Sequence, residues 1–269
     1  NAWNAQWSHN RYRAYYPWTI GGAVWSMYDY NRGCCDNICY SGLADLFRLP
    51  KFGLLYFRTQ MKEGTFTPAG PMTYEVFINS HWLEGSSDTL QVYGNVDEVK
   101  LQLNGRVIAR QYPDDKPSTS EYVSRPDGGN AENIDFPPFT FFNVNWERGE
   151  LKAIGYKDGK TVAEHVVRTP GAVEAMDITY FESGVSASCR DLLIVYVNLK
   201  DLQGTGCFGE NNREVKLEVL QGGELRGPAT IKAEAGVASF LVATTDSPML
   251  VLKAVSGNLE TMRKLKLKK

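Results

Sequence analysis

The spacing of hydrophobic positions changes twice along the chain. Trp3 and Trp7 are four positions apart, and Tyr12, Tyr15 and Tyr16 continue at helical spacing, so we expect an aromatic-faced helix up to Pro17. Residues 19–27 are almost all apolar or small, a run typical of a strand buried on both faces of a parallel sheet. From Thr73 onward, apolar and polar residues alternate, which predicts short, half-buried strands.

A polar loop and a second helix follow the apolar run. Residues 29–42 are rich in Asp, Asn and Gly without an apolar period, which predicts a loop. Pro50 fits the first turn of a helix, and the apolar stripe of residues 52–62 predicts that this helix continues to residue 62. A strand, a polar loop at its carboxyl end and a helix form one unit of a (β/α) barrel, where such loops face the active site.

The alternating part predicts two β-sandwiches of immunoglobulin type. Asn104-Gly105 and Asp158-Gly159 each separate two alternating runs, a strong signal for a hairpin, and Gly222-Gly223 is expected to form another. Residues 263–269 alternate Leu with basic residues, as an edge strand does, and a basic tail that binds an anionic partner is the alternative. Segments rich in Pro and Gly mark the boundaries, so we expect three domains, at residues 1–65, 66–170 and 171–269.

Three stretches resemble, in the same order, one known family. The first is GAVWSMYDY from Gly22, followed by GLAD from Gly42 and RLPK from Arg48. The second is Ser80-His81-Trp82 with DEVKLQLNG after it, and the third is ELKAIGYKDGK from Glu150. They resemble the last barrel strand, loop and helix, and the domain that follows, in family 2 glycoside hydrolases, the β-galactosidase and β-glucuronidase group.

The resemblance implies the carboxyl-terminal part of a retaining glycoside hydrolase that acts on β-galactoside-type carbohydrate. The implied fold is mainly β, with two immunoglobulin-like β-sandwiches preceded by an α/β remnant of the last unit of a (β/α)8 barrel. In this family both catalytic glutamates lie on earlier barrel strands, and residues 1–62 contain no Glu. We therefore expect no catalytic residue in this chain, no cofactor, and no activity of the segment alone.

The resemblance places Trp25 at the carboxyl end of the last barrel strand, where the family uses an aromatic side chain to line the sugar pocket. An indole there would cover the C–H face of a sugar ring, and barrel core is the alternative. Asp29 could accept hydrogen bonds from sugar hydroxyls or cap the loop backbone. Glucuronidases of the family carry an Asn-x-Lys pair before the glycine matching Gly42, whereas this chain has Cys39-Tyr40-Ser41. The lack of this lysine favours a neutral galactoside.

Composition restricts the partners. The chain is 43% hydrophobic and 22% charged with a formal net charge of −2, so we expect no nucleic acid partner, and no apolar run is long enough for a membrane span. Cys34, Cys35 and Cys39 could together hold a soft metal, but no histidine lies near them in sequence. We therefore predict no metal site and thiols packed in the loop.

Some expectations concern packing and partners. His81 and Trp82 are expected to fill the interface between the barrel segment and the first sandwich, and His165 is expected at the surface of a strand. Residues 1–65 are expected to lean on the first sandwich or to be held by a second copy in a homo-oligomer. A periplasmic or extracellular location is suspected from the family resemblance. The rival hypothesis is a stand-alone carbohydrate-binding or adhesion module.

Overall fold

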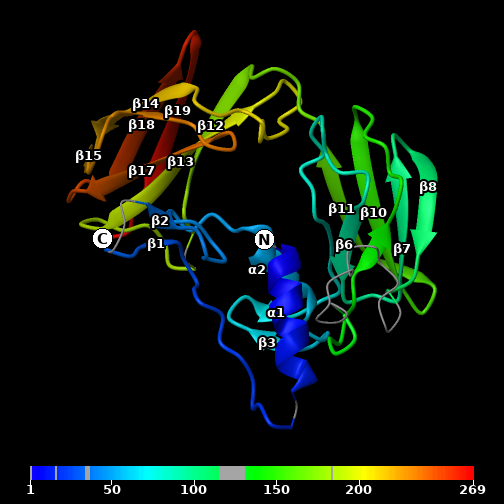
Figure 1. Ribbon diagram of the computed structural model, residues 1–269. Helices are drawn as coiled ribbons and strands as arrows, with labels where there is room; N and C mark the ends of the chain where they lie inside the picture. Colours follow the sequence, from blue (N-terminus) through cyan, green and yellow to red (C-terminus); the bar gives the residue numbers. More distant parts are fainter. Residues whose placement is uncertain (1, 16, 34–36, 115–130, 183) are drawn as a thin grey trace. The chain divides into compact units, whose positions relative to one another are not determined.

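The computed structural model describes residues 2–15, 17–33, 37–114, 131–182 and 184–269. Contacts divide the chain into two compact units, Asn1–Thr169 and Pro170–Lys269 (Figure 1). Each unit contains a β-sandwich of antiparallel strands, so the predicted mainly β fold is confirmed. No described helix is long and apolar enough to cross a membrane.

Two helices precede the sandwich strands of the first unit. Helix α1 spans Ala2–Ala14 and packs against helix α2, which spans Phe52–Thr59. Helix α2 begins later than predicted, because Pro50 is held extended by a bridge to Ala44 and Lys51 takes the cap position. It also ends before residue 62.

Helix α1 leans on the first sandwich through a mostly polar face. Its buried side chains are Ala2, Gln6 and Asn10, whereas Trp3 and Trp7 of the predicted aromatic face are only half-buried. Gln6 Oε1 accepts a hydrogen bond of 2.8 Å from the Tyr93 hydroxyl, and Asn10 Oδ1 accepts one of 2.8 Å from the backbone N–H of residue 133. Hydrogen bonds therefore fix the helix in addition to apolar packing.

The apolar run at residues 19–27 is extended but does not form the predicted strand. No strand in the described part of the chain pairs with it, and Ile20 and Trp25 are 107% and 75% exposed. A strand buried on both faces needs neighbours for its backbone N–H and C=O groups. Within the described residues, its backbone hydrogen bonds lie at its two ends. The backbone N–H of Thr19 donates to Tyr15 at 3.1 Å, and Ser26 and Met27 accept hydrogen bonds from the backbone N–H of Leu43 and Ala44 at 3.0 and 2.9 Å.

The first sandwich pairs a three-stranded sheet with a four-stranded sheet. The first sheet has the order β5-β6-β9, with bounds Val76–Ile78, Leu90–Gly94 and Phe139–Phe141. The second has the order β11-β10-β7-β8, with bounds Lys160–Arg168, Glu150–Lys157, Glu98–Leu103 and Arg106–Gln111. A short pair precedes them, β3 at Phe66–Thr67 and β4 at Gly70–Pro71.

Both predicted hairpins of this sandwich form. Asn104 and Gly105 join β7 to β8 with φ values of 49° and 78°, and Asp158 and Gly159 join β10 to β11 with values of 50° and 72°. Two successive positive φ angles are the signature of a turn whose twist matches that of the paired strands. Each dipeptide thus sets the register of the two strands that it joins.

Trp82 does not fill an interface, contrary to the expectation. Its side chain is fully buried in the core of the first sandwich, and its indole N–H donates to the backbone oxygen of Glu147 at 3.0 Å. His81 is exposed and lies against the ring of Phe52 in helix α2, with centroids 4.8 Å apart. The two neighbours therefore have different surroundings: Trp82 lies in the sandwich core and His81 lies against helix α2.

The second sandwich has two four-stranded sheets around its own core. One sheet has the order β12-β13-β17-β15, with bounds Ala175–Tyr180, Leu192–Lys200, Val237–Thr244 and Gly223–Leu225. The other has the order β16-β14-β18-β19, with bounds Thr230–Lys232, Glu214–Gln221, Met249–Ser256 and Leu259–Lys266. Strand β19 pairs only with β18 among the described strands, as an edge strand does.

Gly222 is not a hairpin turn. It joins β14 to β15, which belong to different sheets, so the chain changes sheet at this point. Its φ is 80°, and a Cβ there would lie 2.0 Å from the carbonyl oxygen of Met249. Glycine is thus required by a close backbone approach, which the sequence signal of a Gly-Gly pair cannot distinguish from a hairpin.

Two histidines of the first unit are buried enough to favour their neutral forms. Half-buried His165 in β11 accepts a hydrogen bond at Nδ1 from the backbone N–H of Ile78 in β5, at 3.1 Å, rather than lying free at the surface as expected. His9 Nδ1 lies 2.9 Å from the Tyr56 hydroxyl. Burial lowers the pKa of both side chains, and nearby Arg13 lowers that of His9 further.

Acidification is expected to destabilise the first unit selectively. A histidine whose pKa is lowered on folding stabilises the fold fully above its unfolded pKa of about 6.5, and this contribution is lost as pH falls through the folded pKa. All three histidines and all six tryptophans lie before residue 170. Urea unfolding followed by tryptophan fluorescence should therefore give a lower midpoint at low pH than at neutral pH, and His165→Gln should weaken that dependence. An unchanged midpoint would contradict this assignment.

Candidate functional site

One buried carboxylate holds the two ends of the loop after the extended run together by hydrogen bonds and an ion pair. Asp29 is 5% exposed, and its Oδ1 accepts a hydrogen bond of 2.9 Å from the backbone N–H of Gly42. Lys51 Nζ, at the cap of helix α2, lies 2.6 and 2.7 Å from the two carboxylate oxygens. A Cβ at Gly42 would lie 2.3 to 2.4 Å from backbone atoms of Tyr28, Asp29 and Ala44, so only glycine fits here. These contacts fix the two ends of the loop to each other.

Both oxygens of Asp29 are therefore already engaged within the chain. The predicted capping of the loop backbone is present as the hydrogen bond from Gly42. A contact between Asp29 and a sugar hydroxyl would have to share an oxygen with Lys51 or Gly42, and this role stays a prediction. The partner Lys51 lay 22 positions away in sequence, and sequence reasoning did not link the two.

Trp25 precedes the loop that Asp29, Gly42 and Lys51 hold together. Its indole N–H donates to the Tyr30 hydroxyl at 2.7 Å, and the two rings meet edge to face at 86° with centroids 5.9 Å apart. The indole is 75% exposed, so most of its apolar surface is open to a ligand. The pocket role predicted for Trp25 stays a prediction, but its orientation is fixed by Tyr30.

A thiol with an unusual pKa lies beside the same tyrosine. Tyr30 in β1 (Tyr30–Asn31) pairs with Cys39 in β2 (Ile38–Cys39), and Cys39 Sγ lies 3.3 Å from the Ser41 hydroxyl. Hydrogen bonds from Ser41 and Tyr30, with the charge of Arg32, lower the pKa of Cys39 to about 7. A large share of this thiol is therefore ionised at neutral pH. Sequence reasoning missed the pair because a two-residue strand leaves no period.

The metal alternative cannot be built from the described residues. Cys34 and Cys35 lie outside them, and no group of three His, Cys, Asp or Glu side chains within them is arranged to hold an ion. Cys39 is a free thiol there.

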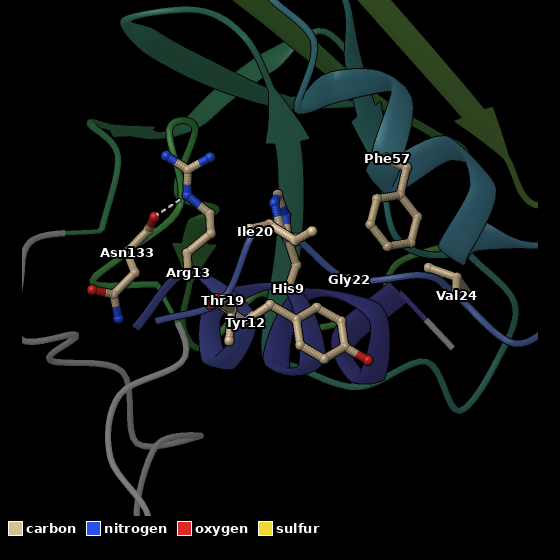
Figure 2. Close-up of a pocket in the computed structure, with 10 residues that line it drawn as sticks. His9, Tyr12, Arg13, Thr19, Ile20, Gly22, Val24, Phe57 and Asn133 are labelled. Carbon is tan, nitrogen blue, oxygen red and sulfur yellow. Dashed lines mark hydrogen bonds between the residues drawn. The ribbon is translucent and has the colours of Figure 1, made fainter. Parts of the chain in front are cut away.

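A cavity of about 570 Å³ lies between helix α1, helix α2 and the extended run (Figure 2). Tyr12 and Arg13 of α1, Phe57 of α2, and Ile20 and Val24 of the run point into it. None of its ten lining residues is Asp or Glu, so it holds no pair of carboxyl groups for glycoside hydrolysis. The cavity lies where an apolar run without strand partners fails to cover the helix.

The remaining carboxylates of residues 1–62 do not form a catalytic pair. Asp45 caps a turn by accepting a hydrogen bond of 2.8 Å from the backbone N–H of Leu49, and burial raises its pKa. Asp29 is held by Lys51, and Asp36 lies outside the described residues. In the described part of this segment, every carboxylate thus has a structural role.

Comparisons with known proteins give a consistent result. A family model described as a domain of unknown function, DUF4982, matches residues 85–163. A β-galactosidase of Thermoanaerobacter pseudethanolicus is 31% identical over 258 residues, which are 89% of this chain but 32% of that protein. A β-glucuronidase of Formosa agariphila is 27% identical over 75% of this chain and 18% of its own length. The chain thus spans a third or less of these relatives.

Solved structures share the fold. A β-glucuronidase from glycoside hydrolase family 2 superposes with a TM-score of 0.72 at 21% identity, over 93% of this chain and 25% of that chain. A β-glycosidase from Bacteroides vulgatus gives a TM-score of 0.75 at 16% identity, over 98% of this chain and 33% of that one. Over most of its length, the chain is therefore similar to β-galactosidases and a β-glucuronidase, and it shares its fold with a solved structure from glycoside hydrolase family 2.

Proposed function

We propose that this chain is part of a retaining glycoside hydrolase for β-galactoside-type carbohydrates, in which Trp25 and the loop at residues 29–42 form one wall of the sugar pocket. The observation that carries the proposal is the loop fastened by Asp29, Gly42 and Lys51, which keeps its local geometry although the preceding run has no strand partners. Beside this loop, an exposed indole is held in a fixed orientation by Tyr30. An aromatic face with polar neighbours suits a sugar ring.

The two sandwiches support the barrel in this proposal and take no part in the chemistry. Helices α1 and α2 rest on the first sandwich through a shared cluster of Ala2, Tyr56, Phe77 and Tyr93. Such a cluster can transmit the rigidity of the sandwich to the loop that follows α1 and precedes α2. Both catalytic carboxyl groups would come from barrel strands other than those of residues 1–62, which contain no Glu.

The isolated chain is expected to be inactive. Incubation with nitrophenyl β-galactoside should release no nitrophenol above the rate without protein, because the described carboxylates of residues 1–62 are engaged in Asp29–Lys51 and Asp45–Leu49 contacts. Hydrolysis that disappears in Asp45→Asn would overturn the proposal.

Calorimetric titration of the isolated chain with galacto-oligosaccharides should give no heat of binding. A clear binding isotherm would favour the stand-alone binding module instead.

Trp25 is tested in a chimera. This chain replaces the segment that it matches in the Thermoanaerobacter pseudethanolicus β-galactosidase, and hydrolysis of a nitrophenyl galactoside is measured. Trp25→Ala should lower kcat/KM by about 100-fold, because a reacting sugar that is displaced slightly loses that much. Trp18→Ala is the matched control, since this indole is 89% exposed and lies outside the loop. Equal effects of the two substitutions would remove Trp25 from the pocket.

Asp29 is proposed to act by positioning the loop. In the same chimera, Asp29→Ala and Lys51→Ala should reduce kcat/KM by similar factors, because each removes the same buried ion pair and leaves its partner uncompensated. The double variant should be little worse than either single variant. A KM that rises in Asp29→Ala and stays unchanged in Lys51→Ala would instead show that the carboxylate contacts the sugar directly.

The galactoside preference is tested at residues 39–41. The variant C39N/S41K introduces the Asn-x-Lys pair before Gly42, and its cation should pair with a uronate carboxylate. In the chimera, the ratio of kcat/KM for nitrophenyl glucuronide over galactoside should rise by about tenfold or more. The variant C39N/S41Q controls for the altered loop without the charge. A ratio that the lysine leaves unchanged would contradict the role assigned to this loop.

A further inference from the structure

The positive charge of the second unit is concentrated at one end of strand β19. Five of the twelve Lys and Arg residues between 170 and 269 lie in residues 263–269, and this stretch contains no Asp or Glu. All five side chains are exposed: Arg263, Lys264, Lys266, Lys268 and Lys269. The formal net charge of −2 for the whole chain conceals this local excess.

These charges differ from two other lysines of the same sheet. Lys216 pairs with Glu218 at 2.6 Å in strand β14, and Lys253 pairs with Glu260 at 2.7 Å across β18 and β19. In contrast, none of the basic side chains of residues 263–269 forms an ion pair with another described residue. Their field is therefore not neutralised within the described chain.

The register explains why no acid approaches. Lys264 lies opposite Val251 and Lys266 opposite Met249 on strand β18, so their cross-strand neighbours are apolar. On the other side β19 is an edge, with no further described strand. The alternate residues Leu265 and Leu267 pack on the sandwich core, which holds this segment in place. Lys264 and Lys266 thus lie on β19 at the repeat of alternate strand residues, roughly 6.8 Å. Lys268 follows two residues beyond the end of β19, where it forms an isolated β-bridge with Ser188.

We propose that residues 263–269 are a docking strip for an acidic polysaccharide, a chain that carries carboxylate or sulfate groups. A row of exposed, unpaired cations in a run this rich in Lys and Arg is complementary to a polymer with regularly spaced anions. Single-stranded nucleic acid is disfavoured because no aromatic side chain lies within the strip for base stacking. A bilayer is disfavoured because both leucines are turned to the core.

Lysines on edge strands also prevent pairing with other sheets. That protection does not by itself account for five basic residues with no acid among them. The choice of a carbohydrate over other polyanions rests on the proposed function, whereas the charge pattern stands independently of it. Attachment to an acidic polymer through this strip would keep the second sandwich on a polysaccharide while a neutral portion is cleaved elsewhere.

Binding is measured directly on the full chain, without any activity assay. The chain is titrated with chondroitin sulfate, with neutral dextran and with single-stranded oligothymidylate in about 50 mM salt, where exposed charges still act over roughly 14 Å. We expect binding to chondroitin sulfate that weakens as salt is added, and no binding to dextran. The variant K264Q/K266Q/K268Q should bind at least about tenfold more weakly.

The matched control is K216Q/K232Q/K253Q, which removes the same charge from the same sheet and should retain the affinity within about twofold. An equal loss in both triple variants, or no binding of the unmodified chain, would overturn the proposal. Oligothymidylate that binds as tightly as chondroitin sulfate would overturn the assignment to a polysaccharide. Because no hydrolysis is measured, failure of the proposed glycosidase function leaves this result interpretable.

Discussion

A buried β-strand requires hydrogen-bonding neighbours, and this requirement decides which parts of the chain complete their structure. The strands of both sandwiches find partners within their own unit, so each sandwich encloses a core. The apolar run at residues 19–27 has the composition of such a strand but no partner among the described residues, and its large side chains are exposed. The relatives are about three times as long as this chain or longer, and in the proposed barrel the neighbours of this run would be strands outside residues 1–62.

The loop behind this run keeps its form because its contacts are local. The pairing of Asp29 with Lys51 and the close approach at Gly42 involve only residues between 28 and 51. Helices α1 and α2 then gain a base from the first sandwich through Tyr56, Tyr93 and the hydrogen bond of Gln6. A segment that lacks partners on one side is thus held on the other by a fold that is complete in itself.

The sequence predicts features that depend on neighbouring residues better than those that depend on distant ones. The turns at Asn104-Gly105 and Asp158-Gly159 follow from backbone preferences, and the structure confirms both. The hairpin predicted at Gly222-Gly223 was wrong, because a pair of glycines where the chain passes from one sheet to the other gives the same sequence signal as a pair in a hairpin. The prediction of a strand at residues 19–27 was wrong, because its apolar pattern is that of a strand with neighbours on both sides, and the described residues provide none.

The candidate site shows the same division. The resemblance to a known family was enough to single out Trp25 and Asp29, since each stands in a short motif. The sequence did not predict the residues that these side chains contact. Lys51 lies 22 positions after Asp29, a spacing that no helix or strand pattern links. Tyr30 pairs with Cys39 through strands of only two residues, which are too short to show a pattern. Sequence motifs therefore identified the loop, whereas the contacts within it became clear only from the folded structure.

Hydrogen exchange at the backbone amides of residues 19–27 tests this account most directly. It is measured in the isolated chain and in the chimera with the Thermoanaerobacter pseudethanolicus β-galactosidase. We expect rapid exchange in the isolated chain, as in an unpaired segment, and strong protection in the chimera, where the proposed barrel would supply parallel neighbours. Strong protection of these amides in the isolated chain would contradict it, because the run would then have found its partners within this polypeptide.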